Sequence, residues 1–120
     1  MSLIDSPLIG IVSRALNLTS QRQTLVSQNI ANIDTPGYHA RDIDFRQELE
    51  RAAAADQEVT ATPFVRQVPG LIERPDGNNV SIDRESLLLA QNQLQFQGEI
   101  ALLHSEFNRL QLAINGGNSQ

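Results

Sequence analysis

The chain contains no cysteine. This absence excludes disulfide bonds, thiolate metal sites and a cysteine nucleophile, so packing and hydrogen bonds alone must hold the fold. Lysine is also missing, because the nine basic residues are all arginines, and the net charge is −5. A protein that binds nucleic acid needs a basic face to neutralise phosphates. We therefore expect no nucleic-acid partner.

Long apolar runs are missing as well. No uninterrupted apolar stretch approaches the roughly 18 to 20 residues that cross a bilayer, so we expect no membrane insertion. Residues 1–7, which read MSLIDSP, lack the cationic start, the apolar core and the small-residue cleavage site of a secretory signal. If the protein leaves the cytoplasm, we expect it to do so without a cleaved signal peptide.

Motifs of catalysis are scarce. The two histidines, His39 and His104, lie in different segments without a second ligand at metal-binding spacing. A glycine-rich phosphate loop after a strand and a Gly-x-Ser-x-Gly elbow are both absent. Asp42 and Asp44 could form a catalytic carboxylate pair, although the approach to a helix N-terminus explains them equally well. We predict a protein without enzymatic activity, cofactor or metal, and keep a small hydrolase as an alternative.

The first stretch with helical periodicity covers residues 7–32. Pro7 suits the first turn of a helix, and Pro36-Gly37 ends the pattern. Apolar residues recur at three- and four-residue spacings and form a wide apolar face. One line of this face consists of Ile9, Val12, Leu16, Val26, Ile30 and Ile33.

The last stretch runs from residues 81–83 to residue 114 and is more regular. Asn115-Gly116-Gly117 is the expected stop of this helix. Its strict alternation of three- and four-residue spacings is typical of a coiled-coil seam. Gln93 fills one position of this rhythm, and the apolar residues of the seam are Leu89, Phe96, Ile100, Leu103, Phe107, Leu110 and Ile114.

The middle of the chain has a different character. Asp44 followed by Gln47 resembles a capping box, which predicts a short helix to about Ala55. Residues 56–80 combine β-branched pieces with proline and glycine, which indicates extended segments and turns that could form a short hairpin. The predicted fold is mainly α, with long N- and C-terminal helices packed as an antiparallel coiled-coil-like pair. Its expected parts are the N-terminal helix (1–33), the loop, short helix and extended segment (34–80), and the C-terminal helix (81–120).

Charge is distributed very unevenly. Seventeen of the 23 charged residues lie between Asp34 and Glu85, so both long helices carry mainly serine, asparagine and glutamine on their polar faces. Such uncharged groups can be buried when they are hydrogen-bonded. A two-helix hairpin of this size cannot bury two wide apolar faces by itself. We therefore predict that both apolar lines form an assembly interface. The simpler alternative, in which the helices pack on each other with solvated polar faces, stays open.

A resemblance to a known family lies at the end of the first helix. Residues 27–38, which read SQNIANIDTPGY, resemble the signature of the flagellar axial proteins, which are the rod, hook and hook-associated subunits. The following HARDIDF and the later DGNNV are similar to the proximal rod members, and the resemblance covers nearly the whole chain. Ser81 stands where the family often has an acidic residue, and serine caps a helix equally well. The signature residues are Asn29, Asn32, Thr35, Pro36, Gly37 and Tyr38.

The resemblance implies a structural subunit of the proximal rod of the flagellar basal body. Such a subunit polymerises helically, transmits torque between the membrane ring and the distal rod, and forms part of the export channel. Implied partners are copies of itself, other rod proteins, the adaptor at the membrane-ring end, and the type III apparatus that exports it to the periplasm-spanning rod. Asn29 and Asn32 would hydrogen-bond backbone or amide groups at the end of the helix, while Thr35, Pro36, Gly37 and Tyr38 would set the exit angle of the chain. A soluble helical adaptor or chaperone that binds a partner helix remains the alternative.

Overall fold

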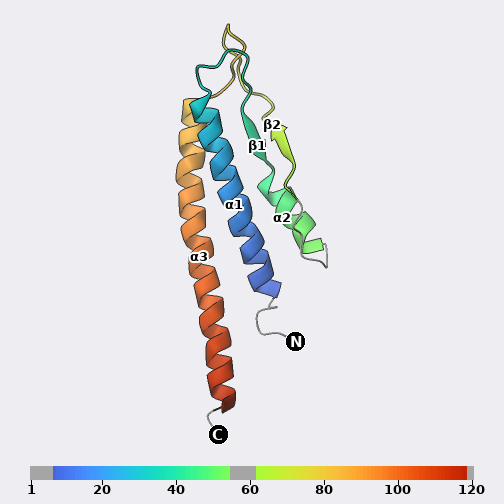
Figure 1. Cartoon of the computed structure of the whole chain (residues 1–120), viewed down its shortest axis with the longest axis vertical. Coiled ribbons are helices and arrows are strands. Elements are labelled where there is room, and N and C mark those ends of the chain that lie inside the picture. The colour runs from blue at the N-terminus through green and yellow to red at the C-terminus, as the bar shows by residue number, and fades with distance from the viewer. Residues whose placement is uncertain (1–6, 55–61, 119–120) are drawn as a thin grey trace.

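A computed structural model describes residues 7–54 and 62–118 of this elongated molecule, which measures 72 × 26 × 18 Å. Its elements are α1 (Pro7–Ala31), β1 (Arg41–Ile43), α2 (Phe45–Ala54), β2 (Val65–Gln67) and α3 (Ile82–Asn118). The helices α1 and α3 run antiparallel and side by side, and α3 extends beyond the start of α1 (Figure 1). The predicted fold class is confirmed.

Helix α1 ends where the sequence predicts, within one residue. The backbone N–H of Asn32 donates to the carbonyl of Gln28 at 3.1 Å, and the Asn32 side-chain amide donates to the same carbonyl at 2.8 Å. These bonds satisfy a helix-end carbonyl that would otherwise lack a partner. The chain then reverses at Gly37, whose φ of 74° is easily reached only by glycine.

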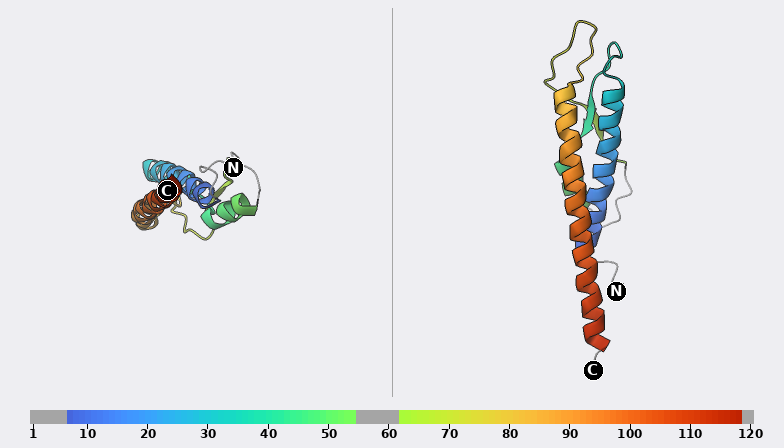
Figure 2. Two further views of the ribbon diagram at one scale, coloured as in Figure 1. Left: turned by 90° about the horizontal axis from the view of Figure 1, so that it is seen from below. Right: turned by 90° about the vertical axis from the view of Figure 1, so that its left-hand side faces the viewer.

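Helix α1 forms the middle layer of the molecule. Seen end-on, it lies between α3 on one side and α2 on the other (Figure 2). Leu18 and Leu25 of α1 pack with Ile43 of β1, and Phe45 and Leu49 close this core cluster from the side. Helix α1 therefore buries two faces inside the chain, one against α3 and one against the strand and α2.

The two short strands, which are separated in the sequence by α2, pair with each other. Strand β1 runs antiparallel to β2, with Asp42 opposite Arg66, and the N–H of Val68 extends the ladder by donating to the carbonyl of Ala40 at 2.9 Å. The second strand lies within the stretch expected to be extended. Its partner strand β1 precedes α2, and the sequence did not predict a strand there. The β-branched pair Val59-Thr60 lies outside the described residues.

A buried carboxylate of α2, that of Glu48, links the middle segment to α1. Asp44 caps α2 as predicted, because its Oδ1 accepts the N–H of Gln47 at 3.1 Å. Glu48, one turn further, is 4% exposed and lies 3.8 Å from the guanidinium of Arg14 on α1. Its other oxygen accepts the N–H of Phe64 at 3.0 Å. Glu48 thus joins α1, α2 and the approach to β2.

Helix α3 begins at a serine cap and runs further than expected. The Ser81 hydroxyl accepts the N–H of Arg84 at 3.3 Å. The stop predicted at Asn115-Gly116-Gly117 was wrong, because the helix continues to Asn118. Glycine ends a helix when it adopts a left-handed conformation, and Gly116 does not do so. Its presence inside the helix costs only about 1 kcal/mol relative to alanine.

Candidate assembly site

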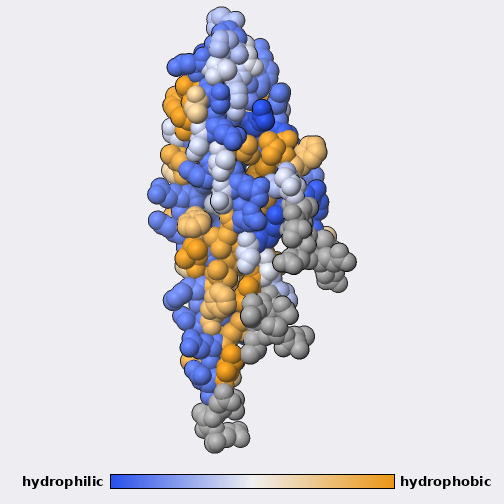
Figure 3. Space-filling view, viewed as in Figure 1, coloured by the Kyte–Doolittle hydropathy of each residue, from blue (hydrophilic) through white to orange (hydrophobic). Residues whose placement is uncertain are grey.

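The apolar line predicted on the C-terminal helix lies open. Five of its residues are between 39 and 47% exposed, and Leu103 and Leu110 are half-buried. Figure 3 shows an apolar column along the C-terminal half of α3, where this helix runs past α1. We call the five exposed residues the α3 stripe: Leu89, Phe96, Ile100, Phe107 and Ile114.

The face of α3 that meets α1 is mainly polar. The buried side chains of α3 in the described part of the chain are Glu85, Leu88, Asn92 and Glu106. The hydroxyl of Thr19 on α1 lies 2.7 Å from Oε1 of Glu99, and the Asn92 amide donates to Gln23 Oε1 at 3.3 Å. Hydrogen bonds therefore hold the helix pair in register, while most of the large apolar residues of α3, apart from the buried Leu88, stay at least partly exposed.

The line predicted on α1 is largely used inside the chain. Ile9, Val12 and Val26 are buried, and Leu16, Ile30 and Ile33 are half-buried. The side of α1 that faces outward carries small uncharged residues instead, among them Ser13, Ser20 and Thr24. Most of the exposed apolar surface in the predicted interface therefore belongs to α3. Assembly through the α3 stripe remains a prediction.

An open groove of about 460 Å³ runs between the two long helices. Its lining consists of Thr19, Ser20, Gln23 and Thr24 from α1 and Leu89, Asn92, Gln93 and Phe96 from α3. None of these residues is charged. The α3 side supplies two members of the α3 stripe, and the α1 side supplies hydroxyls and an amide. A groove with this lining suits a helix whose contact face is apolar and uncharged.

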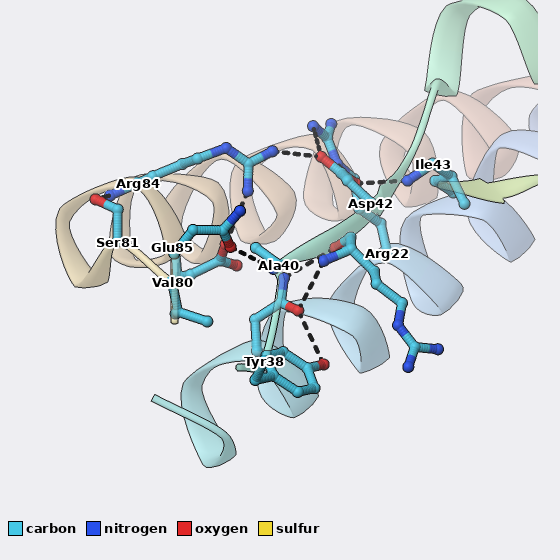
Figure 4. Close-up of polar contacts among 12 residues, drawn as sticks. Arg22, Tyr38, Ala40, Asp42, Ile43, Val80, Ser81, Arg84 and Glu85 are labelled. Carbon is cyan, nitrogen blue, oxygen red and sulfur yellow. Dashed lines mark hydrogen bonds and ion pairs between the residues drawn. The ribbon is translucent and has the colours of Figure 1, made fainter. Parts of the chain in front are cut away.

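The signature residue Asn29 ties the end of α1 to β1. Its side chain is fully buried and pairs with both backbone groups of Arg41, donating to the carbonyl at 2.9 Å and accepting the N–H at 3.0 Å. We expected Asn29 to bond at its own helix end, whereas the structure gives it a strand partner. The hydroxyl of Tyr38 turns inward and donates to Asn29 Oδ1 at 3.3 Å (Figure 4).

A second asparagine, which the sequence did not single out, completes the turn. Asn78 is fully buried, and its amide donates to the carbonyls of Asn32 and Thr35 at 2.9 and 2.8 Å. Its Oδ1 accepts the N–H of Val80 at 2.8 Å. The resemblance of DGNNV to rod proteins marked this segment without giving a role. The signature turn and residues 74–80 are therefore one hydrogen-bonded unit, which we call the junction.

Two glycines let the two loops of the junction approach each other. The N–H of Gly37 donates to the carbonyl of Asp76 at 2.9 Å. Gly77 has a φ of 86°, and a Cβ atom placed on it would lie 3.3 Å from the Cα atom of Gly37. Backbone rather than a flexible side chain would therefore have to move to admit any other residue.

Gly77→Ala is expected to lower the free energy of unfolding by about 1–3 kcal/mol, because alanine at positive φ is strained and its methyl group crowds Gly37. Chemical denaturation followed by circular dichroism measures this change. Gly10→Ala on α1 is the matched control, since a Cβ there meets no atom within 4 Å. Equal unfolding midpoints for the two variants would contradict the role of Gly77.

Asp42 connects three elements electrostatically. Arg22 of α1 donates two hydrogen bonds to its carboxylate, each of 2.9 Å, and Arg84 of α3 donates a third at 2.8 Å (Figure 4). Arg84 also reaches the fully buried Glu85 at 2.7 Å. These contacts occupy Asp42, while Asp44 caps α2. Both aspartates of the alternative hydrolase thus have structural partners.

Within residues 7–54 and 62–118, no three histidine, cysteine or acidic side chains are grouped so that they could bind a metal ion. His39 instead lies 2.8 Å from Glu73. Among the described helices, none combines the length and the apolar character needed to span a membrane.

Comparisons with known proteins agree with the signature at the junction. A family model described as flagella basal body rod protein matches residues 11–39, which cover most of α1 and the signature turn. The flagellar basal body rod protein FlgB of Salmonella typhimurium is 36% identical over 124 residues, which cover 87% of this chain and 90% of that protein. The FlgB of Aeromonas hydrophila is 35% identical, with 97% of this chain and 98% of the relative covered. The FlgB of Cereibacter sphaeroides is 37% identical, with 90% and 94% covered. With such identity along nearly its whole length, the chain belongs to the FlgB family of flagellar basal body rod proteins.

Proposed function

We propose that the chain is a structural subunit of the proximal rod, which polymerises helically with copies of itself. The observation that carries this proposal is the α3 stripe, which lies exposed beside an uncharged groove in a member of a rod family. Each Å² of apolar surface removed from water contributes about 25 cal/mol, so the exposed leucine, isoleucine and phenylalanine side chains of the α3 stripe favour association. Contacts of this kind between neighbouring copies would build the rod.

The junction and the ion pairs that Asp42 forms with Arg22 and Arg84 support a mechanical role. They fix α1, β1 and α3 relative to one another through partly buried hydrogen bonds and ion pairs, so the subunit is stiff where the helices meet. We infer that it transmits torque between the membrane ring and the distal rod and lines part of the export channel.

The same proposal includes the partners and the location of the chain. We infer that it contacts other rod proteins and the adaptor at the membrane-ring end, and that its place is the periplasm-spanning rod. The type III apparatus would export it unfolded and without cleavage. Since the long helices carry few charges, neighbouring subunits can cover them without leaving unpaired buried charge.

Deletion of the gene, followed by complementation with a tagged chain, tests this function. Without the chain, we expect non-motile cells whose basal bodies stop at the membrane ring. With the tagged chain, we expect motility to return and the tag to co-purify with basal bodies. Complete basal bodies in the deletion strain would overturn the proposal.

The groove favours one other candidate function, that of a soluble helical adaptor or chaperone. Its open shape and uncharged lining could hold one partner helix. Such a protein would be a stable monomer or dimer at micromolar concentration, which light scattering with circular dichroism measures. A lasting complex with a cytoplasmic partner, together with absence from basal bodies, would favour this function over the rod.

A further inference from the structure

Helix α3 carries a second apolar surface, distinct from the α3 stripe. Leu87, Leu94 and Leu112 are 59, 72 and 71% exposed, far more than the stripe residues. At about 100° of rotation per residue, these three leucines share one line, roughly 150° around the axis from the α3 stripe. We call them the back line. A single helix thus presents apolar side chains on two separate flanks.

The two flanks differ in shape. The α3 stripe forms one wall of the groove with α1, so this side of the molecule is concave. The side chains of the back line are each more than half exposed, so they project from the helix, and we call this surface the ridge. Leu87 and Leu94 are seven residues apart, as are Leu89 and Phe96 in the groove wall, and both pairs span two helical turns or about 10.5 Å. Ridge and groove wall therefore have the same repeat.

Their chemistry also matches. The groove lining contains no charged residue, and α3 carries none between Glu85 and Glu99. On the α1 side, Ser20 and Thr24 are small enough to let another helix approach closely. Burying the ridge in the groove would place leucines against Leu89 and Phe96 without enclosing an unpaired charge.

We propose that the back line of one copy packs into the groove between α1 and α3 of the next copy. This inference rests on the proposed function and identifies the first neighbour of each subunit as a second copy of the chain. Because the ridge and the groove are different surfaces, each copy keeps one of them free after the contact forms. Such a head-to-tail contact extends into an open helical array rather than closing into a symmetric dimer.

Paired cysteines test this contact, because the chain has none of its own. One tagged copy carries Leu94→Cys on the ridge, and a second, differently tagged copy carries Thr24→Cys in the groove. After oxidation of basal bodies from cells that produce both, we expect a disulfide-linked dimer bearing both tags. Its yield should exceed at least tenfold that of the control pair, Leu94→Cys with Gln47→Cys on the exposed surface of α2.

Each other outcome has a definite meaning. A dimer formed by Leu94→Cys alone would show a symmetric ridge-to-ridge contact and overturn the proposal. A crosslink from Leu94→Cys to a different protein would overturn the choice of occupant. Leu87→Cys with Ser20→Cys is the second pair, and absence of the mixed dimer in both pairs also counts against the contact. Recovery of the tagged chain in basal bodies tests the rod function separately, so the inference can fail while that function stands.

Discussion

Phe107→Asp is expected to abolish incorporation of the chain into the rod while leaving the free chain folded. Phe107 is 47% exposed in the isolated chain, so a carboxylate there stays in water and costs little. Between packed helices the same charge would be buried without a partner, at a cost of about 3–5 kcal/mol. This corresponds to a loss of about 100- to 5,000-fold in affinity.

The amount of tagged chain in isolated basal bodies, together with swimming in soft agar, measures this effect. Phe107→Leu is the control, because it keeps an apolar side chain and should incorporate almost normally. Leu103→Asp should act in the same direction, but Leu103 is half-buried, so its effect would mix assembly with folding. Normal motility of the Phe107→Asp strain would show that the α3 stripe is not an interface.

Asn78→Ala is expected to lower the free energy of unfolding by about 2–4 kcal/mol, since each buried polar group left without a partner costs about 1–3 kcal/mol. The substitution would leave the N–H of Val80 without its partner and would remove one of the two hydrogen bonds that the carbonyls of Asn32 and Thr35 each accept. Urea unfolding of the free chain measures the change. Asn78→Asp should be at least as damaging, because it would point an oxygen at two carbonyl oxygens.

The control for this prediction is an exposed asparagine on the same protein. Asn17 makes one exposed hydrogen bond with Gln21, and Asn17→Ala should change the free energy of unfolding by less than about 0.5 kcal/mol. If Asn78→Ala unfolded at the same urea concentration as Asn17→Ala, the junction would not be held as described.

The long helices could be predicted because their signals are local. Apolar periodicity marked both helices, Pro7 and Ser81 marked their starts, and Asp44 marked the cap of α2. The pairing of β1 with β2 had no such signal. Strand β1 buries Asp42 because Arg22 and Arg84, which are distant in sequence, neutralise it. A three-residue strand with two charged residues therefore shows no hydrophobic pattern.

The candidate site could be predicted only in part, for a related reason. Periodicity identified the α3 stripe, but it marks apolar faces without showing whether the chain itself covers them. The face of α3 that meets α1 is polar at Glu85, Asn92 and Glu106. The apolar periodicity of α3 therefore identified the exposed α3 stripe and not the face that packs on α1. The role of Asn78 could not be predicted from the sequence, because its side chain bonds to carbonyls more than 40 residues away. The only local signal was the neighbouring Asp76-Gly77 pair, which predicts a turn but no partner for Asn78.

A reconstruction of the basal body at side-chain resolution tests the central claim most directly. We predict that the α3 stripe of each copy, including Phe107, lies in van der Waals contact with a neighbouring subunit, within about 4.5 Å. A rod in which neighbouring copies touched only through β1, α2 and β2, with the α3 stripe facing water, would contradict the account.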